Sequence, residues 1–321
     1  PYTRFTIPRD RKSISGYVAC TGEVVNLPDV RNIPDSEPYT FDDSYDRMAD
    51  YITTSSLTLP LINSRHQVVG VLQLINTKND QGEFVPFPLE TEPLARYFAS
   101  MATLALERAM LTRTLLMRMV NMTSLRDPKE TGPHVNRVGS YAVAIYDSWA
   151  DKNGYGVKEK IMTRDVLRMA AMLHDLGKTG IADAILKKPE PLSDSERIAM
   201  QAHCGIGAEI LKNCESEFDE MAMDIARCHH ENWDGSGYPE GLSERDIPFM
   251  ARITSVADVF DALSSKRVYK EPWPEDKVIM EMDSMFGTKF DPGLKKHFME
   301  QLPVLREIRE RYPDEEGKAL N

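Results

Sequence analysis

The chain has 321 residues, enough for about two domains with buried cores. Its content of 41% hydrophobic and 28% charged residues excludes a mainly disordered protein. The net charge of −11 argues against broad nucleic-acid binding, and no run of ~18 apolar residues predicts a membrane-spanning helix.

The N-terminal residues and the cysteines indicate in which compartment the protein is expected. Residues 1–10 are polar and charged, which argues against a signal peptide, and the missing initiator Met predicts that a longer protein precedes them. The four cysteines form no CxxC pair, which argues against a disulfide framework or a structural zinc knuckle. We therefore expect a reducing, cytoplasmic location.

A β-hairpin is predicted in the first part of the chain. The segments 57–62 and 68–75 are apolar, and the polar segment 63–67 separates them as a turn. His66 lies in this turn, so we expect it to be a solvated surface residue rather than a ligand.

A long helix is predicted from about Glu92 to Leu125, because no Gly and no Pro after Pro93 interrupt it. Apolar residues recur with a spacing of three and four over its later half, although two arginines weaken the series. The helix either packs on its own domain or forms a parallel two-chain coiled coil between domains; its length favours the second interpretation. The spaced positions are Met101, Leu104, Arg108, Leu111, Leu115, Arg118, Met122 and Leu125.

The first part resembles a GAF domain in residues 15–23, in 70–76, in Phe87 and in the long helix that follows. Such domains are commonly longer, so we expect the early helix and first strand to be missing. The resemblance implies either small-ligand binding or a purely structural, dimerising role. The structural role is favoured, because the cyclic-nucleotide signature is matched only loosely, by Asn76, Lys78 and Phe84.

The chain after residue 132 has a helical pattern interrupted by Gly and Pro loops, without a convincing strand. Arg126-Asp127-Pro128 ends the long helix, because the residue before a proline disfavours the α conformation. The predicted helices cover 135–152, 164–175, 194–201, 217–228, 249–263, 274–286 and 293–302.

Histidines and acids in this part predict a metal centre. His174-Asp175 ends an apolar helix and precedes Gly177-Lys178, so an aspartate able to bridge two ions stands beside a cation. His229 and His230 end another helix, where neither a core nor a surface favours two adjacent titratable rings. Asp258 lies within an apolar helix and needs a partner, either a metal or a cation on another helix.

Further candidates are His203, at the end of a helix, and His134, at the start of one. Glu130 precedes His134 by four residues and is either a ligand or a plain acid at a helix N-terminus. Cys204 and Cys228 are expected to be small packing residues. Five imidazoles and three carboxylates predict two divalent ions and allow a third; ligation without thiolate suits Fe best, Mn next and Zn less.

Residues from about 120 to 310 resemble an HD-GYP domain, the branch of HD metal-dependent phosphohydrolases that cleaves cyclic di-GMP in bacteria. Ala182 departs from the family pattern, but only in a loop. The matching segments are 126–128, 174–178, 185–189, 229–239, 253–261, 267–270 and 287–292.

The resemblance implies roles for individual residues. Lys178 would stabilise charged phosphate oxygens while Asp175 bridges the ions. Arg267 and Lys270, three apart on one face, and Tyr238 would contact the substrate. Trp233 either stacks on guanine or packs, and His297 is expected at the surface or at an interface. The binuclear ligands would be His174, Asp175, His203, His229, His230 and Asp258, with Glu130 and His134 holding a third ion.

The predicted fold class is therefore an α+β GAF-like domain over 1–108, a connecting helix over 92–126 and an all-α HD-type domain over 127–321. The expected function is hydrolysis of cyclic di-GMP to pGpG and GMP. The alternatives are a silent cyclic-dinucleotide receptor or scaffold, and an enzyme acting on cyclic GMP-AMP. The expected partners are a second copy through the connecting helix and, by the resemblance, a diguanylate cyclase domain at Gly237-Tyr238-Pro239.

Overall fold

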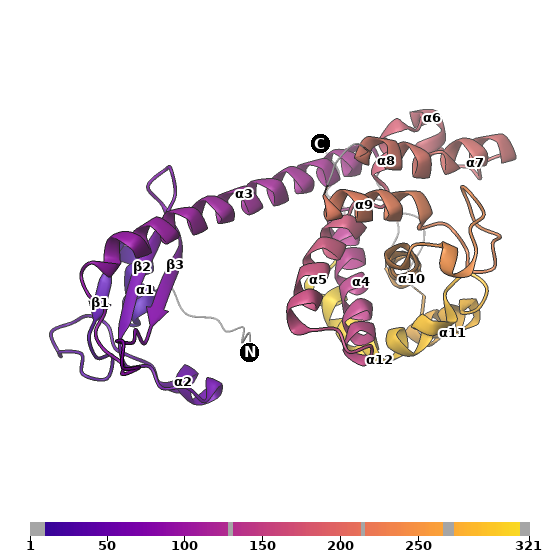
Figure 1. The fold of residues 1–321 in the computed structure, drawn as a ribbon. Helices are drawn as coiled ribbons and strands as arrows, with labels where there is room; N and C mark the ends of the chain where they lie inside the picture. Colours follow the sequence, from indigo (N-terminus) through magenta and orange to yellow (C-terminus); the bar gives the residue numbers. More distant parts are fainter. Residues whose placement is uncertain (1–9, 128–130, 213–215, 266–272, 315–321) are drawn as a thin grey trace. The chain divides into compact units, whose positions relative to one another are not determined.

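A computed structural model describes residues 10–127, 131–212, 216–265 and 273–314. The chain divides into two compact units, 1–112 and 113–321. The first unit carries the β-sheet and the second is helical (Figure 1). Over the described ranges, no helix combines the length and apolar character needed to cross a membrane.

The sheet of the N-terminal unit has three antiparallel strands in the order β1-β2-β3. The strands are β1 (Val25–Leu27), β2 (Ser56–Ile62) and β3 (Val68–Ile75), and Leu59 pairs with Leu72. The predicted hairpin is thus confirmed. His66 lies exposed in its turn with a φ of 57°, as expected for a surface residue.

Two helices cover the sheet. Leu57, Leu59 and Leu61 of β2 are buried against Ala95 and Ala99, whose small side chains let the first turns of α3 (Thr91–Arg126) lie close. The helix α1 (Ile14–Thr21) contacts β2 and β3 and begins at Ser13, whose hydroxyl accepts the backbone N–H of Gly16. A short helix, α2 (Ser44–Ala49), precedes β2.

The predicted long helix is confirmed as α3, a single helix of 36 residues. Near its end Val120 is buried in the core of the C-terminal unit. A series of positions with alternating steps of four and three is exposed along the whole helix. These are Leu94, Tyr97, Met101, Leu104, Arg108, Leu111, Leu115, Arg118, Met122 and Leu125.

The described part of the C-terminal unit contains helices and short 3-10 turns and no named strand. Its helices are α4 (Gly132–Lys152), α5 (Val157–Ala171), α6 (Asp183–Leu186), α7 (Asp194–Gln201), α8 (His203–Leu211), α9 (Glu217–Cys228), α10 (Phe249–Ser264), α11 (Glu275–Met285) and α12 (Lys295–Arg311). The 3-10 turns are η1 (Leu176–Gly180), η2 (Glu244–Asp246) and η3 (Pro292–Leu294).

The predicted ranges of α7 and α9 agree with the structure; that of α10 differs by one residue at its C-terminal end, and that of α11 by one residue at each end. Two short helices, α6 and α8, were not predicted. The prediction that the last helix ends at 302 is wrong: α12 continues through Pro303 to Arg311, because Leu305 and Ile308 are buried and hold its last turns in the core.

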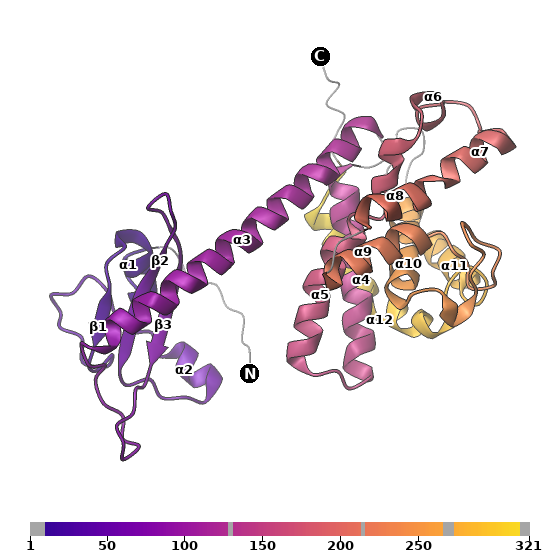
Figure 2. The same ribbon diagram turned by 45° about the horizontal axis from the view of Figure 1, so that its top comes forward.

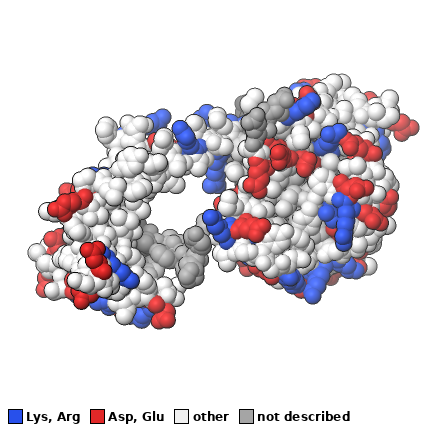
Figure 3. Space-filling model, in the orientation of Figure 1, with Lys and Arg blue, Asp and Glu red and all other residues white. Residues whose placement is uncertain are grey.

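The helix α10 lies at the centre of this unit and packs against α4, α5 and α9 (Figures 1 and 2). Buried side chains such as Tyr141, Val256 and Phe298 fill the core between the helices. His297 of α12 is also buried, with its Nδ1 3.0 Å from the Ser148 hydroxyl, so of its two expected places the surface is wrong. On the face in Figure 3, acidic and basic side chains are intermixed over this unit.

Candidate metal centre

His174 and Asp175 lie in a tight turn between α5 and η1. The helix α5 ends at Ala171, and Leu173 and His174 donate hydrogen bonds to carbonyls only three residues earlier. The prediction that both residues end a helix is therefore wrong. The tighter turn lets two consecutive side chains face one site, which an α-helix would point about 100° apart.

Gly177 permits a close approach between this turn and α8. A Cβ atom at Gly177 would lie 1.9 Å from the carbonyl oxygen of His203 and 2.4 Å from the backbone nitrogen of Gly207. No side chain fits there, so this glycine brings His203 next to the HD turn. His203 is the first residue of α8, rather than the end of a helix as predicted, because α7 ends at Gln201.

The remaining candidates come from three other helices. His229 caps the C-terminus of α9 and His230 follows it, as predicted. Asp258 lies within α10. His134 is in the first turn of α4, where Pro133 is tolerated and the Thr131 hydroxyl accepts the His134 backbone N–H. Four separate segments and the HD turn therefore contribute to one site.

The seven described candidates form two groups. In each group the possible ligand atoms all lie within 4.8 Å of one another. The first group is Asp175, His203, His229 and His230; the second is His134, His174 and Asp258. The structure thus places His134 with two residues expected to hold the binuclear pair, whereas Glu130, its expected companion, lies outside the described residues.

Asp175 stands between the two groups. Its Oδ2 lies 3.3 Å from Nε2 of His174, in the second group. Its Oδ1 lies 3.1 Å from Nε2 of His203 and 3.7 Å from Nε2 of His229, in the first. One carboxylate therefore faces both groups, which is the arrangement that a bridging ligand requires.

Backbone carbonyls orient three of the imidazoles. Nδ1 of His174 donates to the carbonyl of Ala171 at 2.8 Å, and Nδ1 of His203 to that of Met200 at 2.7 Å. Nδ1 of His229 lies 3.0 Å from the carbonyl of Ile225. When the ring is neutral its one proton is on Nδ1, so each ring then directs its Nε2 lone pair at the site, as metal-binding histidines do.

A carboxylate performs the same task for His134. Nδ1 of His134 donates to Oδ2 of Asp261 at 2.8 Å, and Nε2 lies 3.8 Å from Asp258. Arg137 in turn donates two hydrogen bonds to Asp261, of 2.5 and 2.9 Å. All three members are buried, so His134 is held in one orientation and one tautomer.

Charges within the site differ from those in water. Burial would raise the pKa of Asp175, but Lys178 and His174 hold it well below its usual range. Burial lowers the pKa of His229 and, more strongly, of His230, where the neighbouring His229 adds to the effect. Burial opposes protonation of His203 as well, yet its hydrogen bond with Asp175 raises its pKa to about 10.

The residues present fit divalent metal ions. Nε2 of His229 is buried and makes no hydrogen bond among the described residues, a costly state that an ion would relieve. The donors are imidazole nitrogens and carboxylate oxygens, the set used by Fe, Mn and Zn. Cys228 is no competitor, because burial raises the pKa of its thiol to about 12.

Three further predicted residues lie around the centre. Nζ of Lys178 is 2.7 Å from Oδ2 of Asp175, so the cation stands beside this carboxylate as expected. The Tyr238 ring lies 4.8 Å from the His230 ring, so it borders the first group. Trp233 carries the Arg252 guanidinium over its ring at 5.7 Å, which favours the packing alternative. Arg267 and Lys270 lie outside the described residues.

Residue patterns had not singled out three groups at this site: Arg137, Asp261 and Lys289. Arg137 follows His134 by three residues, and Asp261 follows Asp258 by three, so helical spacing alone would have placed each beside a ligand. Lys289 is half-buried in the loop before η3, and its carbonyl accepts the Trp233 N–H at 3.1 Å. Burial lowers the pKa of Lys289, against the field of Asp258.

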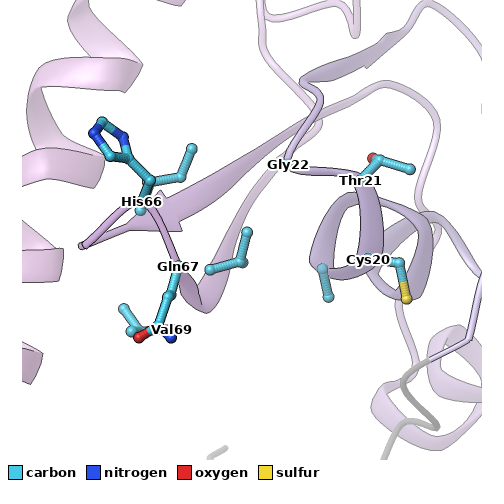
Figure 4. A pocket seen from close by; sticks show the side chains of 9 residues that line it. Cys20, Thr21, Gly22, His66, Gln67 and Val69 are labelled. Atoms are coloured by element: carbon cyan, nitrogen blue, oxygen red, sulfur yellow. The ribbon is translucent and has the colours of Figure 1, made fainter. Parts of the chain in front are cut away.

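In the N-terminal unit, the residues that loosely match the cyclic-nucleotide signature contact other residues of the same unit. Asn76 bonds to its own unit through Thr54, Ile52 and Tyr51, and Lys78 lies over the Phe84 ring. An open pocket of about 630 Å³ lies between the end of α1 and the hairpin turn (Figure 4). Among the described residues that line it there is no Lys or Arg, and His66 is the one side chain that could present a positive charge to a nucleotide phosphate. Ligand binding by this unit stays a prediction.

Comparisons with protein families agree with this geometry. A family model described as "GAF domain" matches residues 2–106, and one described as "HD domain" matches residues 143–294. The C-terminal unit is thus an HD domain. The chain joins a GAF domain to an HD domain, in the order that the resemblance to GAF and HD-GYP domains predicts.

Three similar curated proteins, from two of the bacteria represented, illustrate the likeness. A "3'3'-cGAMP-specific phosphodiesterase 2" of Vibrio cholerae is 39% identical over 203 residues, which cover 63% of this chain and 37% of that protein. A "Cyclic di-GMP phosphodiesterase" of Thermotoga maritima is 37% identical over 201 residues, covering 63% and 52%. A "Probable cyclic di-GMP phosphodiesterase" of Vibrio cholerae is 34% identical over 280 residues, covering 84% and 60%. The chain therefore spans less than two thirds of these relatives.

Proposed function

We propose that this protein is a metal-dependent phosphodiesterase that hydrolyses cyclic di-GMP to pGpG and then to GMP. The observation that carries the proposal is the Asp175 carboxylate, whose two oxygens face two separate groups of ligand atoms. The names of the bacterial relatives support a cyclic dinucleotide as the substrate.

Each residue has a distinct proposed task. Bound divalent ions would neutralise the phosphodiester and lower the pKa of a coordinated water. His203, His229 and His230 with Asp175, and His134 and His174 with Asp258, would hold them. Lys178 would stabilise charge on the phosphate oxygens, since its ammonium already stands at the edge of the site.

Substrate binding would involve residues around this centre. Tyr238 borders the first ligand group, and its ring offers a face to a nucleobase or a sugar. Arg267 and Lys270 stay predicted phosphate contacts. The metals that we propose are Fe first, then Mn and Zn, with Glu130 providing for a third ion beside His134.

A test of the activity is product analysis with metal-loaded protein. Cyclic di-GMP and 3'3'-cyclic GMP-AMP are supplied in separate reactions, and Asp175→Ala is compared with Asp165→Ala, an exposed aspartate on α5. We expect pGpG and GMP from cyclic di-GMP, loss of both metal and turnover in the Asp175 variant, and no change in the control. Parental turnover in the Asp175 variant would overturn the proposed site.

A second candidate substrate is cyclic GMP-AMP, favoured by the 39% identity to a cGAMP-specific relative. Hydrolysis of that dinucleotide alone, in the same reactions, would replace the first candidate. A silent receptor or scaffold is less favoured, because every candidate ligand is present in the sequence and the seven described ones form two groups. Binding of either dinucleotide without any product would establish it.

We further propose that two copies associate in parallel through α3. The exposed positions from Leu94 to Leu125 follow the four-three spacing of a coiled-coil seam. Leu111 is 58% exposed and Leu115 is 48% exposed. Contact with water is unfavourable for these apolar side chains, and packing against a second helix would bury them. A diguanylate cyclase domain at the Tyr238 loop and a cytoplasmic location stay predictions.

Sedimentation and turnover measured on the same samples test the dimer. Leu111→Glu with Leu115→Glu should separate the chains and change the rate of hydrolysis. Ala105→Glu with Thr112→Glu is the matched control, because both residues are exposed on α3 but lie one position away from the seam. A parental protein that sediments as a monomer would overturn the proposed association.

A further inference from the structure

The end of α3 packs directly on the HD turn, within the C-terminal unit. Val120 and Thr123 are buried there, at 3% and 6% exposure. Together with Leu173, Asp175 and Leu176 they line one small cavity. The last turns of the connecting helix are therefore part of the wall behind the bridging aspartate.

Arg126, the last residue of α3, is fastened to the chain that follows the HD motif. Its guanidinium donates to the carbonyls of Thr179 and Ile181, the latter at 3.0 Å, and to the Asp183 carboxylate at 2.6 Å. A guanidinium has its donors in a fixed, planar fork, so these three acceptors define one position for the end of the helix. The link extends from the end of η1 to the first residue of α6.

Asp127 makes a second link from the same point. Its carboxylate is 2% exposed and lies 3.4 Å from Nζ of Lys178. Nζ of Lys178 is also 2.7 Å from Oδ2 of Asp175. The ammonium of Lys178 thus stands between Asp127, which directly follows α3, and Asp175 of the first ligand group. A displacement of Asp127 would therefore change the distance from Lys178 to Asp175.

We propose that Arg126 and Asp127 are positioning residues that couple the connecting helix to the metal centre. Arg126 holds the segment 179–183, and Asp127 sets Lys178 against Asp175. A shift or rotation at the end of α3 is then transmitted to Lys178 and the HD turn through two short contacts. This inference rests on the proposed phosphodiesterase and names its route of regulation.

Hydrogen exchange on the metal-free protein tests the links without relying on activity. In Arg126→Ala, the amides of Thr179 to Asp183 should exchange on the order of tenfold faster, since opening this segment becomes easier by that factor. Arg126→Lys should restore part of the protection, because it keeps the charge but not the fork. Arg113→Ala, an exposed arginine on the same helix, is the control.

Kinetics separate positioning from substrate binding. We expect Asp127→Asn, which keeps the side-chain shape, to lower kcat by about tenfold with KM and metal content unchanged. In the Arg126→Ala background, Leu111→Glu with Leu115→Glu should no longer change the rate, although it does so in the parent.

The outcomes distinguish the two proposals. A parent that hydrolyses neither dinucleotide refutes the proposed function, while hydrogen exchange still tests the Arg126 link. An active parent with parental exchange in Arg126→Ala and parental kcat in Asp127→Asn overturns the coupling. A KM increase alone in Asp127→Asn also overturns it, because that residue would then act on substrate binding.

Discussion

The two units use buried polar side chains in opposite ways. In the GAF domain, Asn76 and Asp46 are buried, and each bonds to backbone and side-chain groups a short distance away in its own unit. In the HD domain, Nδ1 of each of three buried histidines, His174, His203 and His229, bonds to a backbone carbonyl and fixes the ring. The Nε2 atoms of these rings then point into the shared site. A buried polar group that is satisfied locally stabilises a fold, whereas several half-satisfied groups that converge indicate a ligand site.

The largest effect is expected from Gly177→Ala, which tests whether convergence depends on the close approach of α8. Its Cβ would lie 1.9 Å from the His203 carbonyl oxygen, so the HD turn and α8 would separate. We expect loss of metal binding and of hydrolysis. Gly205→Ala in α8 is the control, because nothing lies within 4 Å of its added Cβ. Normal metal content in Gly177→Ala would contradict this account of the site.

Asp261→Asn tests the orientation of His134. The change removes the fully buried one of the two acids that pair with Arg137, which is itself 2% exposed, and leaves Asp314, whose side chain is 34% exposed. It should lower the free energy of unfolding by about 3 kcal/mol. It should also weaken binding at the group of His134, His174 and Asp258 by roughly 10- to 100-fold while the other group keeps its ion. Denaturant unfolding and metal titration measure both, with exposed Asp246→Asn as the control. Equal loss from both groups would contradict their independence.

Asn76→Ala tests the opposite claim, that this residue only stabilises the GAF domain. It removes three side-chain hydrogen bonds and places alanine at a φ of 56°, so we expect a loss of about 2–4 kcal/mol in the unfolding of that unit. Metal content and kcat should not change. Asn76→Gly separates the two causes, because glycine accepts this φ without making the bonds. An unaltered unfolding transition would instead make Asn76 a candidate for ligand binding.

The smallest expected effect is the release of about one proton per chain when metal binds at pH 8. The pKa of His203 is raised to about 10, so the metal-free residue is protonated below that pH and must lose its proton to become a ligand. His229 and His230 have lowered pKa values and are already neutral. Apparent Mn²⁺ affinity should therefore rise with pH up to about 10. Calorimetry in buffers of different ionisation enthalpy measures the number of protons released. If no proton is released at pH 8, His203 is not a metal ligand.

Local patterns in the sequence were sufficient for the hairpin, for α3 and for the choice of seven candidate ligands that the structure brings together. They were insufficient where contacts between distant segments determine the local backbone or bring ligands together. The turn that holds His174 depends on Gly177 meeting α8, a contact between residues 26 positions apart in the sequence. His203 begins a helix rather than ending one, because α7 and α8 are separated by Ala202 alone. The grouping of His134 with His174 and Asp258 likewise requires three segments to meet.

The ion pair of Arg137 with Asp261 also determines where the HD domain can be cut. Arg137 donates to the carbonyl of Tyr312 at 2.8 Å and pairs with the Asp314 carboxylate at 2.9 Å, so the end of α12 is tied to the residue that orients His134. The family match covers only 143–294. A fragment trimmed to that range would lack His134 and Arg137 and would leave Asp261 buried without its cation. The smallest piece that keeps this arrangement whole extends from before His134 to Asp314.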